Sequence, residues 1–138
     1  MLKAKDIMVK HVICVRKDTP VLDAMKLMVE NTITGIPVTD EDRTLVGMLS
    51  EQDILRLFHT FNDERDRAVS DFMTQPAVYF EEEEPVLDIC YCLRDYTIRR
   101  VPITSNGKVV GIISRSDIIK HILELSEQNA PQVVGESK

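Results

Sequence analysis

Two segments of the sequence share the pattern Gly-x-x-Ser-x-x-Asp, one beginning at Gly47 and the other at Gly111. A serine hydroxyl beside the free N–H groups of a helix start favours an anion, and the glycine would let a ligand approach the backbone closely. The carboxylate three residues later could accept hydrogen bonds from both hydroxyls of a ribose. The same pattern is also a capping box, in which the two side chains only satisfy N–H groups of their own helix. Both interpretations stay open for the two pairs, Ser50 with Asp53 and Ser114 with Asp117.

Charge is distributed unevenly around these two segments. Residues 94–120 contain six basic residues and two acids, a local charge of +4, whereas residues 30–56 contain two basic residues and six acids, a local charge of -4. An excess of positive charge near a helix start indicates an anion site, although a solvated basic face would show the same pattern. The six basic residues are Arg94, Arg99, Arg100, Lys108, Arg115 and Lys120. Because Thr34 and Gly35 stand where the second segment has Arg99 and Arg100, any phosphate recognition should be asymmetric.

Residues suited to catalysis or metal binding are not grouped in the sequence. His11, His59 and His121 share no motif with a nucleophile or a carboxylate. The cysteines are Cys14, Cys90 and Cys92, an odd number without the spacing of metal ligands. We therefore expect neither an enzyme, nor a metal site, nor a disulfide framework.

The two serine segments belong to a longer internal repeat. Asp6 and Met8 correspond to Asp71 and Met73, 65 residues later. Further matches are Pro-Val-Leu-Asp at 20–23 and 85–88, Thr-Ile at 32–33 and 97–98, and a hydrophobic-Pro-hydrophobic-Thr run at 36–39 and 101–104. A repeat of this length makes the architecture a duplication of one supersecondary unit.

Each unit is predicted to run strand, helix, strand, strand, helix. The first strands are expected at residues 12–15 and 77–80, and a helix with one apolar stripe follows each Pro-Val-Leu-Asp motif. Asn106 and Gly107 predict a two-residue hairpin turn in the second unit, and residues 40–43 a longer turn in the first. The last helices begin near the two serines. Their predicted buried stripes are Ile54, Leu57, Phe58 and Phe61 in the first unit and Ile118, Ile119, Ile122 and Leu123 in the second.

The predicted fold class is α/β, of the mixed α+β kind, in which each unit is a small mixed sheet with two helices. We expect the first unit at residues 1–61, a charged linker at 62–68, the second unit at 69–129 and a flexible tail at 130–138. One unit of about 60 residues buries too little surface to be comfortably stable alone. The two units should therefore pack about a pseudo-twofold axis, with clefts between them.

Composition excludes several classes of protein. The 138 residues include 17 Lys and Arg against 23 Asp and Glu, and the net charge of -6 disfavours nucleic-acid binding. No apolar run is long enough for a membrane span, and the N-terminus has no signal-peptide core. These features favour a cytoplasmic globular protein.

In combination and in duplicate, these motifs resemble the cystathionine-β-synthase (CBS) domain family over roughly residues 4–125. The resemblance implies a pair of CBS motifs, or Bateman module, with adenosine-type ligands in the clefts. It implies that Asp53 and Asp117 hold ribose hydroxyls and that Ser50 and Ser114 approach phosphate or ribose. It also implies an adenine slot walled by Ile36, Pro37, Val101 and Pro102 with Val12 and Ala77, and phosphate contacts from Thr34, Arg99 and Arg100, near which Arg115 also lies.

The favoured hypothesis is a homodimeric module that senses an adenine nucleotide, AMP or ATP first, and regulates another protein in trans. Its strongest site is expected at Ser114, Asp117 and Arg99. The pseudo-twofold axis could, however, bring an arginine of one unit toward the ligand of the other. The alternatives are a sensor of S-adenosylmethionine or NADH, and an interaction module in which the serine motifs serve only as caps.

Overall fold

The structure is a computed structural model that describes residues 1–64, 66–95 and 97–129. The predicted tail, residues 130–138, lies outside the described residues, as does residue 65 of the predicted linker. The rest of that linker includes part of a short helix, α4 (Phe61–Glu64). Arg67 forms an ion pair with Glu64 of this helix.

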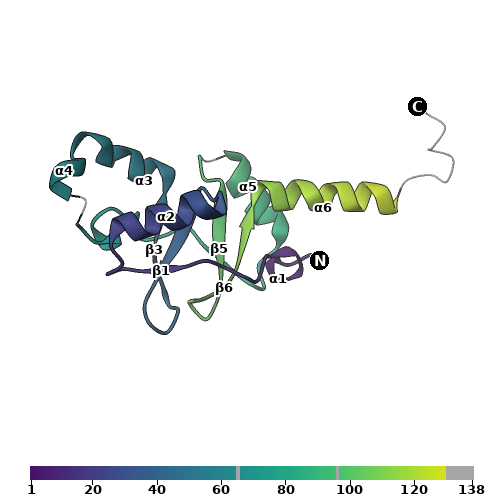
Figure 1. The fold of residues 1–138 in the computed structure, drawn as a ribbon. Coiled ribbons are helices and arrows are strands. Elements are labelled where there is room, and N and C mark those ends of the chain that lie inside the picture. The colour runs from purple at the N-terminus through teal and green to yellow at the C-terminus, as the bar shows by residue number, and fades with distance from the viewer. Residues whose placement is uncertain (65, 96, 130–138) are drawn as a thin grey trace, which may run out of the picture.

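Each half of the chain runs strand, helix, strand, strand, helix, as predicted (Figure 1). The first half contains β1 (Val15–Arg16), α2 (Val21–Asn31), β2 (Gly35–Thr39), β3 (Leu45–Ser50) and α3 (Glu51–Leu55). The second contains β4 (Phe80–Glu81), α5 (Val86–Asp95), β5 (Arg100–Ser105), β6 (Lys108–Ser114) and α6 (Arg115–Gln128). Shorter helical segments are α1 (Ala4–Ile7), η1 (Arg56–His59) and η2 (Val69–Asp71).

The two halves form separate sheets with the same topology, in the orders β1-β2-β3 and β4-β5-β6. The first pair in each sheet is parallel and the second is antiparallel. Both antiparallel pairs change register at one equivalent point, after Val38 and after Ile103. The predicted fold class is therefore confirmed. The two repeats are alike even in the position of the register shift within each sheet.

The leading segment of each repeat packs on the other half of the molecule. Helix α1 lies against β6 and α6 (Figure 1), and Ala4 is fully buried in a core made by α5, β5 and β6. Conversely, Val69 of η2 is fully buried in the core formed by α2, β2 and β3. The N–H of Val9 donates to the carbonyl of Ile112 at 2.9 Å, and the N–H of Met48 to the carbonyl of Thr74 at 3.0 Å. Each hydrophobic core is therefore completed by a segment from the other repeat.

The glycines of the two serine motifs contact methionines of these exchanged segments. A Cβ on Gly111 would lie 2.4 Å from the sulfur of Met8, and a Cβ on Gly47 would lie 2.7 Å from the sulfur of Met73. The expectation that these glycines make room for a ligand is wrong, because methionine side chains fill that space.

The first strands are shorter than predicted and begin later, at Val15 and Phe80 instead of residues 12 and 77. The reason is the exchange of leading segments: the chain pairs with the second half at Val9 and with the first half at Val15. The residues between these two points cross from one half to the other and do not pair in a sheet.

The two hairpins meet at their tips. Asn106 and Gly107 have φ values of 53° and 82°, as a two-residue turn with two left-handed positions requires, so this prediction is confirmed. The N–H of Leu45 donates to the carbonyl of Gly107 at 2.9 Å, and the N–H of Val109 donates to the carbonyl of Arg43 at 3.0 Å. Backbone hydrogen bonds therefore join the two sheets.

The predicted buried stripes of the last helices are only partly correct. In the first half the helix is broken into α3, η1 and α4; Leu57 is buried, but Phe58 is 85% exposed. In α6, Ile118 packs against the core, whereas three members of the stripe are exposed to between 57% and 59%: Ile119, Ile122 and Leu123. No described residue covers this face, because α6 extends beyond the sheets (Figure 1).

Candidate ligand-binding site

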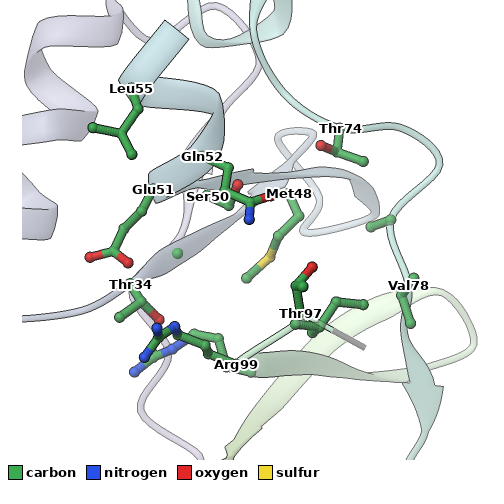
Figure 2. Close-up of a pocket in the computed structure, with 14 residues that line it drawn as sticks. Thr34, Met48, Ser50, Glu51, Gln52, Leu55, Thr74, Val78, Thr97 and Arg99 are labelled. Atoms are coloured by element: carbon green, nitrogen blue, oxygen red, sulfur yellow. The ribbon is translucent and has the colours of Figure 1, made fainter. Parts of the chain in front are cut away.

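A cavity of about 430 Å³ lies between the two halves, beside the start of α3 (Figure 2). Its first-half residues come from the start of β2, from β3 and from α3: Thr34, Gly35, Met48, Ser50, Glu51, Gln52 and Leu55. Its second-half residues lie before β4, before β5 and at the first position of β5: Thr74, Ala77, Val78, Thr97, Ile98, Arg99 and Arg100. This volume is within the range of small-molecule sites in proteins.

The walls of the cavity differ in chemistry from one side to the other. Met48 and Val78 lie on the side where Figure 2 also shows Thr97, and Ala77 and Ile98 add further apolar surface. Thr34 and Glu51 lie on the opposite side, toward which the side chain of Arg99 extends (Figure 2). An apolar slot with charged groups at one end suits a flat ring that carries an anionic substituent.

Arg100 is a partly desolvated cation at this cavity. It is the first residue of β5, where it pairs with Ser114 of β6. Burial lowers the pKa of its guanidinium, and the nearby charge of Asp117 acts in the opposite direction. Its Nε atom is buried and has no hydrogen-bond partner among the described residues. An unpaired buried donor is costly, and a rotation of the side chain that brings Nε to an acceptor in the cavity would remove this cost.

The Ser50–Asp53 pair forms a capping box at the start of α3. The N–H of Ser50 donates to Oδ2 of Asp53 at 2.8 Å, and the N–H of Asp53 donates to Oγ of Ser50 at 3.3 Å. Asp53 is only 3% exposed, and its carboxylate also accepts from Nη2 of Arg56 at 2.7 Å and Oγ1 of Thr74 at 3.2 Å. Asp53 does not line the cavity, and its oxygens are occupied by protein donors.

The Ser114–Asp117 pair forms the equivalent box at the start of α6. The N–H of Ser114 donates to Oδ2 of Asp117 at 2.8 Å, and the N–H of Asp117 donates to Oγ of Ser114 at 3.2 Å. Asp117 is partly exposed, unlike Asp53. The capping interpretation is therefore satisfied in both halves.

We expect Asp53→Ala to lower the free energy of unfolding by about 1–2 kcal/mol, because it leaves buried donors from two segments unpaired. Asp117→Ala should cost about 1 kcal/mol or less, the usual value of an N-cap contact. Urea denaturation of both variants would test this order, and a larger loss for Asp117→Ala would contradict it.

The structure brings together only part of the set of residues predicted for the site. Five of them line the cavity: Thr34, Ser50, Ala77, Arg99 and Arg100. Ser114, Asp117 and Arg115 lie at the start of α6, outside this cavity. Ile36, Pro37, Val101 and Pro102 are buried in β2 and β5, and Val12 precedes β1.

Sequence reasoning missed several residues of the cavity wall, among them Met48, Glu51, Thr74 and Val78. One signal was present in the sequence: Val78 is the neighbour of Ala77, which the resemblance to the CBS family implies as a wall of the adenine slot. Thr74 follows Met73, whose contact with Gly47 places this segment beside β3, but that contact is not visible before the fold is known.

The fold and this cavity define a tandem module in which two interlocked repeats enclose a space of small-molecule size. The family model described as the CBS domain matches residues 4–60 and 69–124. The chain therefore belongs to the CBS domain family and contains a tandem pair of its domains.

The relatives of this chain are CBS-pair proteins. CBSX1, a chloroplastic CBS domain-containing protein of Arabidopsis thaliana, is 33% identical over an alignment that covers 91% of this chain and 63% of CBSX1. The crystal structure of CBSX2 in complex with AMP has a TM-score of 0.82 at 28% identity and covers 91% of this chain and 99% of CBSX2. The CBS pair of MJ0100, in complex with 5-methylthioadenosine and S-adenosylmethionine, has a TM-score of 0.76 at 26% identity, with coverage of 90% and 98%.

In the described residues, no helix is long and apolar enough to cross a membrane. The chain spans slightly less than two thirds of the length of CBSX1. A cytoplasmic location stays a prediction.

Proposed function

We propose that this CBS pair is a regulatory module that binds AMP in the cavity beside α3. The observation that carries the proposal is the pair Arg99 and Arg100 at one end of a mainly apolar cavity, with Nε of Arg100 buried and unpaired among the described residues. A phosphate would supply acceptors to both guanidinium groups, and hydrogen bonds between charged partners are the strong ones.

The remaining walls suit the rest of a nucleoside monophosphate. Met48, Ala77 and Val78 offer apolar surface to an adenine ring, and Ser50 and Thr97 offer hydroxyls to a ribose. This assignment differs from the sequence hypothesis, which placed the strongest site at Ser114, Asp117 and Arg99. It uses an arginine pair of the second half with the helix start of the first.

The relatives support an adenosyl ligand without choosing one. CBSX2 was crystallised with AMP, and the MJ0100 pair with 5-methylthioadenosine and S-adenosylmethionine. Two arginines favour a dianionic phosphate over the cationic sulfonium of S-adenosylmethionine. AMP is therefore preferred here to S-adenosylmethionine, while ATP and NADH remain the other nucleotides to test.

Thermal unfolding and calorimetric titration with AMP test the proposal directly. A ligand that binds only the folded state stabilises it by about 2.7 kcal/mol at 100 times its dissociation constant. We expect AMP to raise the unfolding temperature, and adenosine to do so much less. Absence of any stabilisation by AMP up to millimolar concentration would overturn the proposal and favour the interaction-module alternative.

We also propose that the module acts as a homodimer and regulates its target in trans. The exposed apolar residues of α6 support dimerisation, since Ile119, Ile122 and Leu123 would lose their contact with water at an interface between copies. We expect sedimentation to show a dimer, and Ile122→Asp to give a folded monomer. A wild-type monomer at micromolar concentration would contradict this arrangement.

A further inference from the structure

Among the described residues that line the cavity, Glu51 is the only acid. It is the first residue of α3, and its N–H donates to the carbonyl of Thr34 at 3.1 Å, so its backbone is held at the rim. Its side chain is exposed. Figure 2 shows its carboxylate on the side of the cavity where Thr34 lies and toward which Arg99 extends. Glu51 therefore stands where the charged end of a bound nucleotide would meet solvent.

We infer that Glu51 restricts this cavity to nucleotides with a single phosphate, by repelling the β- and γ-phosphates of ADP and ATP. The inference rests on the proposed function, because it assumes that the arginines hold the α-phosphate. Of the lining residues that the structure describes, the charged ones are Arg99, Arg100 and Glu51, with a sum of +1. The dianion of AMP is compatible with this charge. Each further phosphate adds negative charge at the rim, beside the carboxylate of Glu51.

The acid is not required by the helix that contains it. Negative charge at a helix start is favourable, which gives an alternative reason for an acid at this position. The second half, however, has Arg115 at the equivalent first position of the longer helix α6, behind the same Ser-x-x-Asp box. The fold therefore accepts either charge at this point, and the difference between Glu51 and Arg115 is available for ligand selection.

A ligand with a positively charged group would be attracted by the carboxylate of Glu51 instead of repelled. The amino-acid end of S-adenosylmethionine has an ammonium that Glu51 could attract and a carboxylate that the arginines could bind. Removal of the charge of Glu51 would then weaken binding, whereas it should strengthen the binding of ATP under our inference. The ATP to AMP ratio and the affinity for S-adenosylmethionine, measured in the same variant, therefore separate the two possibilities.

The test is calorimetric titration of wild type and Glu51→Gln with AMP, ADP, ATP and S-adenosylmethionine, in buffer of low ionic strength without divalent cations. We expect the ratio of the ATP to the AMP dissociation constant to fall about three- to tenfold in Glu51→Gln. The ratio of the ADP to the AMP dissociation constant should fall by a smaller factor. Unit charges about 8–10 Å apart change an affinity about twofold in bulk water and about 15- to 35-fold at the effective dielectric constant of a protein surface, and the expected range for charges at an exposed rim lies between these values. The difference should shrink as salt is added, because exposed charges are screened.

Glu30→Gln is the matched control, since Glu30 is an exposed acid of α2 that does not line the cavity and its replacement changes the net charge equally. Its ATP to AMP ratio should stay within about twofold of wild type. An unchanged ratio in Glu51→Gln, or an equal fall in Glu30→Gln, would overturn the inference while leaving AMP binding intact. Loss of S-adenosylmethionine binding together with an unchanged ATP to AMP ratio in Glu51→Gln would assign this carboxylate to an ammonium and overturn the inference. Absence of AMP binding to wild type would overturn the proposed function itself.

Discussion

Gly111→Ala is expected to lower the free energy of unfolding by about 3 kcal/mol, near the upper end of the cost of overpacking a core. The new Cβ would lie 2.4 Å from the sulfur of Met8 and 2.9 Å from its Cβ. Rotation of the methionine side chain can relieve the first clash but not the second. The backbone of Met8 cannot retreat easily, because its N–H donates to the carbonyl of Ala4 and the next residue pairs with Ile112.

A double-mutant cycle with Met8→Ala identifies the cause. In the Met8→Ala background, Gly111→Ala should cost about 1–2 kcal/mol less than in wild type, because the sulfur and Cγ that it displaces are gone while the Cβ of residue 8, 2.9 Å from the new Cβ, remains. Gly107→Ala provides a control for backbone strain: its φ is +82°, but nothing lies within 4 Å of the new Cβ, so Met8→Ala should not alter its cost. Urea denaturation gives all the values, and equal costs of Gly111→Ala in both backgrounds would refute the contact.

Replacing both Arg99 and Arg100 by alanine is expected to weaken AMP binding by about 100-fold or more. Hydrogen bonds to charged groups contribute about 1.5–3 kcal/mol each, and 1.4 kcal/mol corresponds to a tenfold change in affinity. The single variant Arg100→Ala should account for the larger share, because its guanidinium is the more desolvated of the two. The measurement is calorimetric titration with AMP and with adenosine.

Adenosine distinguishes a lost phosphate contact from a damaged cavity. Its affinity should change less than about threefold in the arginine variants, since it has no phosphate for the guanidinium groups to bind. Lys108→Ala is the matched control, because Lys108 belongs to the same basic window but lies in the hairpin, near Asp42 and away from the cavity. Equal weakening of AMP and adenosine would show that the arginines shape the site without binding phosphate.

The repeat made the order of elements and the sheet topology predictable, because the same apolar spacing and turn residues occur twice. Residues 106–107, for example, could only be a tight turn between two strands. The exchange of leading segments was not predictable. Asp6 and Met8 precede the first strand in sequence, and nothing local shows that Met8 contacts Gly111 instead of Gly47. Contacts between distant parts of a chain depend on the packing of the halves.

In the site, too, local features were predictable from the sequence and tertiary contacts were not. Ser50 with Asp53 and Ser114 with Asp117 are identical in sequence pattern and form identical capping boxes. Only the tertiary structure makes them different, since Thr74 from the other repeat and Arg56 bury the carboxylate of Asp53. The importance of Arg99 and Arg100 was visible as an excess of charge. Their position beside α3 of the other half depends on how the two halves pack, and it could not be predicted from the local sequence.

The exchanged leading segments also bear on how such a chain could have arisen. In this chain Ala4 and Val69 stand on arms that each fill the core of the other repeat, so a single repeat would lack the arm that completes its core here. Two separate copies of one repeat would complete each other by trading arms. The present chain is equivalent to that arm-traded pair, with the C-terminus of one copy joined to the N-terminus of the next through residues 62–68. Gene duplication and fusion would thus have converted an intermolecular assembly into an intramolecular one, and freed the two cavity-facing halves to diverge in charge.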